Sequence, residues 1–164
     1  MTSNTLKFIN KFRAVNNLEI IESKSDIKRL SKDFYNYSPI LTEKLDECIA
    51  DLVVRPSDHQ AVKEVAEICW EFSIPLTLRG SGTGNYGQAV PLFNGVLLPL
   101  PQFTTFEAFD PPPAFVKVQS ACVMPALTKH LATSGSPFRF LPRTWHTPTF
   151  DRTQHTSQLQ SRSN

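Results

Sequence analysis

Long apolar runs, a strong excess of charge of one sign and closely spaced cysteine pairs are all missing from this sequence of 164 residues. The longest mostly apolar stretch, Val90 to Phe103, carries three prolines and is shorter than the roughly 20 apolar residues that a membrane-spanning helix needs. A formal net charge of +2, spread along the chain, gives no argument for nucleic-acid binding. The composition also excludes collagen, a coiled coil and a fully disordered chain. We therefore expect an ordinary globular chain with neither a membrane span nor a nucleic-acid partner.

Cysteine is scarce, and Cys48, Cys69 and Cys122 form no Cys-x-x-Cys pattern. An odd number of thiols cannot all pair within one chain, and this spacing fits no zinc site. We therefore expect three reduced thiols, no metal ligand set and a reducing compartment, the cytoplasm.

Glycine is scarce outside one short segment, since five of the six glycines lie between Gly80 and Gly95. Acidic residues become scarce toward the C-terminus, because residues 111–164 carry six Lys or Arg and one acidic residue. From residue 143 onward few apolar residues remain, too few to offset the entropy of ordering the chain. We predict an N-terminal arm and helix over residues 1–34, a folded region over 35–142 and a disordered tail over 143–164.

Apolar spacing predicts a β-α-β unit in the middle of the chain. Residues 52–54 form an apolar run typical of a buried strand, and residues 74–78 form the next. Between these strands Ser57 and Gln60 have the spacing of a capping box, at the start of a helix that ends at Phe72. Two strands joined by such a helix are parallel. Before this unit, two short helices separated by a turn are predicted over residues 26–51.

Further elements are predicted after the glycine cluster. Asn94-Gly95 lies between two apolar runs, residues 90–92 and 96–98, which indicates a β-hairpin. Residues 115–118 predict a strand, and Pro125 begins a predicted helix that continues to Ala132 and is ended by Gly135. These elements together predict the α+β fold class.

The glycine cluster directly follows the second strand of the predicted β-α-β unit. In Arg79-Gly-Ser-Gly-Thr-Gly-Asn85 the alternating glycines permit positive φ and leave main-chain amides uncovered, so several amides can converge on one anion. The hydroxyls of Ser81 and Thr83 and the amide of Asn85 can add donors. A glycine-rich surface turn that binds nothing is the alternative interpretation.

Two common phosphate-binding motifs do not fit this loop. A P-loop needs a lysine after its glycine, and residues 64–116 contain no lysine. Gly82, Gly84 and Gly87 match the Gly-x-Gly-x-x-Gly spacing, but that motif needs a helix to begin inside it. Pro91 and the turn that follows leave no room for such a helix. A pyrophosphate held by loop amides alone remains.

Three segments resemble the FAD-binding oxidoreductases of the vanillyl-alcohol oxidase, or PCMH, type. They are Asp51-Leu-Val-Val-Arg-Pro-Ser57, Ile74-Pro-Leu-Thr-Leu-Arg-Gly-Ser-Gly-Thr-Gly84 and Gly87-Gln-Ala-Val-Pro91. Within that family the resemblance is greatest to the glycolate oxidase and D-lactate dehydrogenase branch, and it is strong over about residues 35–100. It implies a FAD-binding PCMH-type domain, in which an N-terminal β-α-β subdomain precedes an incomplete second α+β subdomain.

In that family an Arg-Gly-x-Gly-Thr-Gly loop binds the FAD pyrophosphate through its amides. Some members also attach the flavin covalently to a histidine of this loop, but here no His or Cys lies between Cys69 and Cys122, so non-covalent FAD is expected. Gln88 and Pro91 match the segment that continues along the cofactor. The resemblance implies a pyrophosphate-binding role for Arg79, Gly80, Ser81, Gly82, Thr83, Gly84 and Asn85.

The resemblance stops near residues 141–144, where the family continues with a second glycine-rich segment and a substrate domain. We therefore expect a truncated N-terminal fragment, whose partner is the missing C-terminal part of the same enzyme. The implied function is the FAD-binding part of an oxidoreductase acting on a small 2-hydroxy acid or similar alcohol. No catalytic residue is assigned, because the histidines are scattered and Asp33, Asp46 and Asp51 are expected to be solvated, so enzyme activity of this chain alone is left open. The alternative is a non-catalytic module that binds an anionic partner through its basic tail.

Overall fold

The computed structural model describes residues 4–100, 103–109, 115–119 and 122–133. The chain divides between Leu100 and Pro101 into two compact units. The predicted division into residues 1–34, 35–142 and 143–164 stays a prediction, because the last of these segments lies outside the described residues.

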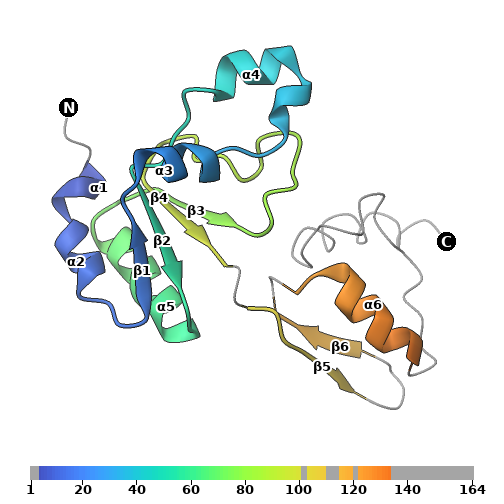
Figure 1. Cartoon of the computed structure of the whole chain (residues 1–164). Helices are drawn as coiled ribbons and strands as arrows, with labels where there is room; N and C mark the ends of the chain where they lie inside the picture. The colour runs from blue at the N-terminus through green and yellow to red at the C-terminus, as the bar shows by residue number, and fades with distance from the viewer. Residues whose placement is uncertain (1–3, 101–102, 110–114, 120–121, 134–164) are drawn as a thin grey trace. The chain divides into compact units, whose positions relative to one another are not determined.

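A four-stranded mixed sheet forms the centre of the first unit (Figure 1). Its strand order is β1 (Leu18–Ile21), β2 (Leu52–Pro56), β4 (Val96–Pro99) and β3 (Leu76–Arg79). β4 is parallel to both β2 and β3, whereas β1 is antiparallel to β2. Helix α5 (His59–Glu71) connects β2 to β3, so the predicted parallel β-α-β unit is confirmed, with β4 inserted between its two strands.

The central strands β2 and β4 are buried on both faces of the sheet, since nearly all their residues are buried and alternate residues of a strand point to opposite sides. On one face Leu52, Val54 and other strand residues pack with Phe12 of α2 (Ile9–Arg13) and Val65 of α5. On the other face Val53 and Leu97 pack with Ile27 of α3 (Lys24–Leu30). Covered faces on both sides are what parallel strands require. The N-terminal helix α1 (Asn4–Lys7), α2 and β1 were not predicted individually.

The two short helices predicted over residues 26–51 are present as α3 and α4 (Pro39–Leu45), with the single turn η1 (Tyr35–Tyr37) between them. Tyr35 and Leu45 form a third buried cluster with Val90. Val90 follows the glycine segment in the sequence, so this cluster fixes α4 and η1 against the end of the glycine loop.

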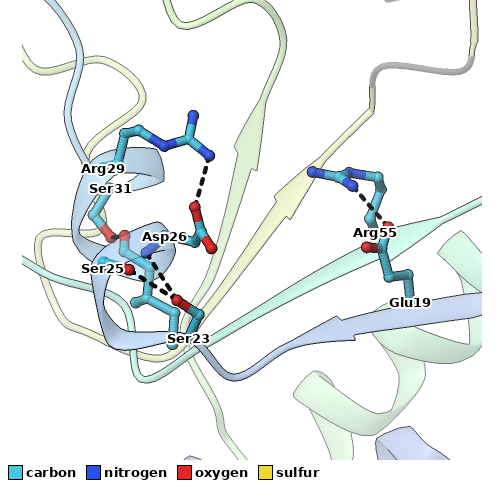
Figure 2. Close-up of polar contacts among 8 residues, drawn as sticks. Glu19, Ser23, Ser25, Asp26, Arg29, Ser31 and Arg55 are labelled. Atoms are coloured by element: carbon cyan, nitrogen blue, oxygen red, sulfur yellow. Dashed lines mark hydrogen bonds and ion pairs between the residues drawn. The ribbon is translucent and has the colours of Figure 1, made fainter.

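Hydrogen bonds hold both ends of α3 (Figure 2). At its start Ser23 Oγ accepts from the Asp26 amide, and Arg29 donates to Asp26 Oδ1 at 2.9 Å. At its end the buried Ser31 hydroxyl donates to the Ile27 carbonyl at 2.8 Å and accepts from the Ala50 amide at 3.0 Å. Ser31 thereby ties the end of α3 to the segment that leads into β2, and it fixes where the next residues leave the helix.

The predicted capping box at the start of α5 is wrong by one residue. Asp58 is the cap, and its Oδ1 accepts from the Ala61 amide at 2.7 Å. The Ser57 hydroxyl instead donates to the Asn17 carbonyl at 3.0 Å, and Gln60 donates to Glu64. The physical reason is a tertiary contact, because the loop before β1 draws Ser57 away from the helix.

The predicted β-hairpin at Asn94-Gly95 is also wrong. Residues 90–92 form no strand, and β4 pairs in parallel with β2 and β3. Asn94 and Gly95 do adopt positive φ, of 59° and 74°, as a tight turn requires. The Gly95 carbonyl, however, accepts from the Asp51 and Leu52 amides, at 2.9 and 3.2 Å. The turn therefore inserts the next strand between two strands that are already parallel.

The second unit contains the strands β5 (Phe106–Phe109) and β6 (Phe115–Val118), which pair antiparallel, and the helix α6 (Met124–Thr133). The predicted strand over residues 115–118 and the predicted helix from Pro125 are confirmed, and Pro125 lies in the first turn of α6. β5 was not predicted. The α+β fold class is confirmed, whereas Gly135 and the tail from residue 143 lie outside the described residues.

Candidate anion-binding loop

The loop that carries the predicted site leaves the sheet at the C-terminal end of β3 and returns at β4. Its first residue, Arg79, is the last residue of β3, and the Arg79 carbonyl accepts from the Leu100 amide at 3.0 Å. Phe34, which follows α3, donates its amide to the Gly84 carbonyl at 2.7 Å. The loop is therefore held from two sides by main-chain bonds that consume its carbonyls.

The amides of the loop are used less than its carbonyls. Within the described residues, the amides of Gly80, Gly82, Gly84 and Asn85 donate to no protein acceptor. The next amide, that of Tyr86, donates to Gln88 Oε1 at 3.1 Å. Amides without a protein acceptor need a partner from water or a ligand, and a glycine-rich segment that contains several of them is suited to an anion.

Arg79 folds back over the loop at Gly82. Gly82 has a φ of +66°, and a Cβ there would lie 2.1 Å from Arg79 Nη2 and 2.3 Å from Arg79 Cζ. Any side chain at this position would therefore be strained and would displace the guanidinium. Burial lowers the pKa of Arg79, and the charge of Asp33 opposes this shift. The guanidinium remains a cation, and its buried Nη1 has no hydrogen-bond partner among the described residues.

Asp33 lies at Gly84 of the same loop and is only 8% exposed, so the expectation that it is solvated is wrong. Its Oδ1 accepts from the Tyr35 amide at 2.9 Å. Its Oδ2 is buried without a hydrogen-bond partner among the described residues and would lie 2.9 Å from a Cβ at Gly84. No local sequence signal singled out Asp33, because its burial depends on a loop some 50 residues later in the chain.

The structure also places the remaining predicted residues. The hydroxyls of Ser81 and Thr83 lie 3.2 Å apart, and Asn85 is exposed. Gln88 folds back, with its Oε1 2.5 Å from where a Cβ of Gly84 would be. Pro91 is buried and accepts from the Asn94 amide at 3.2 Å, so it belongs to the turn that leads into β4.

The other candidate groups give no second site in the part of the chain that the structure describes. No set of three or more His, Cys, Asp or Glu side chains is arranged to hold a metal there, and no described helix is long and apolar enough to cross a membrane. Asp46 pairs with Lys32 and accepts from the Tyr35 hydroxyl, and Asp51 accepts from the Gly95 amide. Both carboxylates therefore serve the packing of the first unit.

Comparison with known proteins places this loop in a family. The family described as a FAD binding domain matches residues 50–149, which is more than half of the chain. The chain belongs to this family. Over 68 residues it is 35% identical to the glycolate oxidase subunit GlcD of Escherichia coli, covering 42% of this chain and 14% of GlcD. Over 56 residues it is 39% identical to a D-lactate dehydrogenase of Archaeoglobus fulgidus, covering 34% of this chain and 13% of the relative.

Solved structures show the same fold at lower sequence identity. p-Cresol methylhydroxylase with bound substrate superposes with a TM-score of 0.64 at 18% identity, covering 90% of this chain and 28% of that one. The predicted PCMH-type fold and its resemblance to the glycolate oxidase and D-lactate dehydrogenase branch are therefore confirmed. The chain spans only a small part of the curated relatives that it matches, 14% of the length of GlcD.

The residues present fit the cofactor of this family. A pyrophosphate carries negative charge on oxygens that accept hydrogen bonds. Among the described residues, the amides named above and Nη1 of Arg79 have no partner and can donate to it. Gly82 and Gly84 supply the space, because a Cβ at either position would collide with a neighbouring side chain. Bonds from such donors to a charged acceptor are worth about 1.5–3 kcal/mol each.

Proposed function

We propose that residues Arg79–Asn85 hold the pyrophosphate of a non-covalently bound FAD, and that the complete protein oxidises a small 2-hydroxy acid or similar alcohol. The observation that carries this proposal is the set of amides at Gly80, Gly82, Gly84 and Asn85, which have no acceptor in the part of the chain that the structure describes, beside the Arg79 guanidinium. When bound, FAD supplies a ring that accepts a hydride from the substrate. The residues of this chain bind and orient that cofactor.

Non-covalent binding is supported by the residues of the loop. Covalent attachment through the loop would need a nucleophilic side chain there, and no His or Cys lies between Cys69 and Cys122. The three described cysteines are free thiols, which favours a reducing compartment such as the cytoplasm.

The substrate class is supported by the names of the relatives. Glycolate and D-lactate are both small 2-hydroxy acids, and the relatives are a glycolate oxidase subunit and a D-lactate dehydrogenase. The matched part is 14% of GlcD, so we propose that this chain is a truncated form of a longer enzyme. Its substrate-binding residues would then belong to the missing C-terminal part, which is the expected protein partner.

The proposal is tested by titrating the full chain with FAD and following the quenching of flavin fluorescence. Gly82→Asp adds a carboxylate where Arg79 lies and where an anion would bind, so affinity should fall by more than about a hundredfold. Asn10→Asp is the matched control, since it adds the same charge at an exposed position of α2. Both variants should keep the fold, which circular dichroism checks.

Saturable quenching by the unsubstituted chain and the Asn10 variant, with none by the Gly82 variant, is the expected pattern. Equal affinity of the Gly82 variant would overturn the assignment of the loop, and absence of binding by the unsubstituted chain would overturn FAD binding by this chain. Retention of the flavin by the chain after denaturation would overturn non-covalent binding.

A further inference from the structure

We infer that Asp33 is a positioning residue of the loop: its carboxylate, at Gly84, holds the Arg79 guanidinium folded over Gly82, ready for a diphosphate. The inference rests on the proposed function of the loop and adds a residue outside it. Asp33 precedes η1 and lies outside all three segments on which the family resemblance rests.

The two charged side chains lie against two glycines of one loop that are separated by a single residue. Arg79 Nη2 lies 2.1 Å from where a Cβ of Gly82 would be, and Asp33 Oδ2 lies 2.9 Å from where a Cβ of Gly84 would be. The Phe34 amide donates to the Gly84 carbonyl at 2.7 Å, so the residue next to Asp33 is fixed to the loop. The Tyr35 amide fixes the carboxylate itself through Oδ1.

Asp33 and Arg79, both among the described residues, form no ion pair within 4 Å, but the charge of Asp33 raises the pKa of Arg79 against the effect of burial. Lys32, the neighbour of Asp33 in the sequence, pairs with Asp46, and Arg29 pairs with Asp26. Asp33 Oδ2 and Arg79 Nη1 are both buried and have no hydrogen-bond partner among the described residues. A buried charge without a bonded partner is costly, and attraction through the weakly polar interior reduces that cost for both groups.

The positioning role and simple charge repulsion predict opposite changes in anion affinity for Asp33→Asn. If Asp33 only repelled a phosphate, Asp33→Asn would strengthen the binding of an anion. If Asp33 holds Arg79 in place, the same variant loses the ordered guanidinium, and binding weakens by about tenfold, the equivalent of one charge-assisted hydrogen bond. The effect should also depend on Arg79.

The experiment is a double-substitution cycle on the full chain, with ADP as the diphosphate probe and isothermal titration calorimetry as the measurement. The variants are Asp33→Asn, Arg79→Gln and the two combined, and Glu43→Gln at an exposed position of α4 is the control for the change in net charge. Asp33→Asn should weaken ADP binding about tenfold alone and should leave it unchanged or strengthen it when Arg79 is already Gln. Asp33→Glu should recover part of the lost affinity.

Each outcome separates the inference from the proposed function. Tighter or equal ADP binding by Asp33→Asn, while Arg79→Gln weakens binding, would overturn the positioning role and leave the loop assignment standing. Equal losses from Asp33→Asn in both backgrounds would also overturn it, because a purely structural residue acts regardless of Arg79. No effect of Arg79→Gln on ADP binding would overturn the role of Arg79 in the proposed function itself.

Discussion

At the scale of single residues, Gly95 and Gly82 each allow a turn that a residue with a side chain would not allow without strain. Gly95 has a φ of +74°, and a Cβ there would lie 2.2 Å from the Pro75 carbonyl oxygen. That oxygen belongs to the backbone and accepts from the Val96 amide at 2.8 Å, so it cannot move without breaking the entry into β4. Gly82 differs, because its close neighbour is the end of the flexible Arg79 side chain.

Gly95→Ala should therefore lower the free energy of unfolding by about 1–3 kcal/mol, through both backbone strain and the clash with Pro75. Chemical denaturation followed by circular dichroism measures the change. Asn94→Gly is the matched control, since Asn94 also has positive φ and glycine adopts it more easily. If Gly95→Ala were as stable as the unsubstituted chain, the close approach of Gly95 to Pro75 would be contradicted.

At the scale of elements, helix α5 depends on the cap at Asp58. The hydrogen bond from the Ala61 amide, followed by that from Asn17, lowers the pKa of the Asp58 carboxyl. Because the pKa of Asp58 is lower in the folded chain than in the unfolded chain, the carboxylate stabilises the fold at neutral pH. This stabilisation is lost as the pH falls through the folded-state value.

Asp58→Ala should lower the melting temperature by a few degrees at pH 7, and the difference from the unsubstituted chain should shrink as the pH falls below about 4. Thermal unfolding at several pH values measures both effects. Ser57→Ala is the comparison that distinguishes the observed cap from the predicted one, because Ser57 bonds to Asn17 and not to α5. If Ser57→Ala lowered the melting temperature more than Asp58→Ala did, and by the same amount at every pH, Ser57 would be the cap instead.

The elements also explain how far the sequence could predict the fold and the site. The β-α-β unit follows from local patterns, since the spacing in α5 and the apolar runs of β2 and β3 are each contained in a few residues. The errors come from distant contacts: Ser57 binds Asn17, 40 residues away, and Gly95 binds Asp51, 44 residues away. The glycine loop was found because its glycine spacing is contained in a few consecutive residues, whereas Asp33 was missed because only the folded chain brings it to Gly84.

At the scale of the whole molecule, the residues proposed to bind the pyrophosphate all belong to the first of the two units. The loop, Asp33 and Arg79 all lie in the unit of residues 1–100, so the interactions proposed for the pyrophosphate come from one compact body. The family match nevertheless runs to residue 149 and thus extends into the second unit. The relatives in which this match occurs are several times longer than the matched part. The proposed pyrophosphate site can therefore be tested in this chain, whereas a test of the proposed oxidation needs the longer protein that we propose.

A ligand that binds only the folded chain raises its free energy of unfolding by mass action. At a free FAD concentration one hundred times the dissociation constant, the increase should be about 2.7 kcal/mol, which raises the melting temperature of the chain by several degrees. Thermal unfolding with increasing FAD, monitored by circular dichroism, measures the shift. Gly82→Asp should melt a few degrees below the unsubstituted chain without FAD, because the φ of +66° at Gly82 strains any other residue. The variant should still fold, since none of the three buried clusters contains a residue of the loop, and it should show no shift with FAD. A Gly82 variant that is stabilised by FAD as strongly as the unsubstituted chain would place the flavin elsewhere on the molecule, since mass action reports binding wherever it occurs.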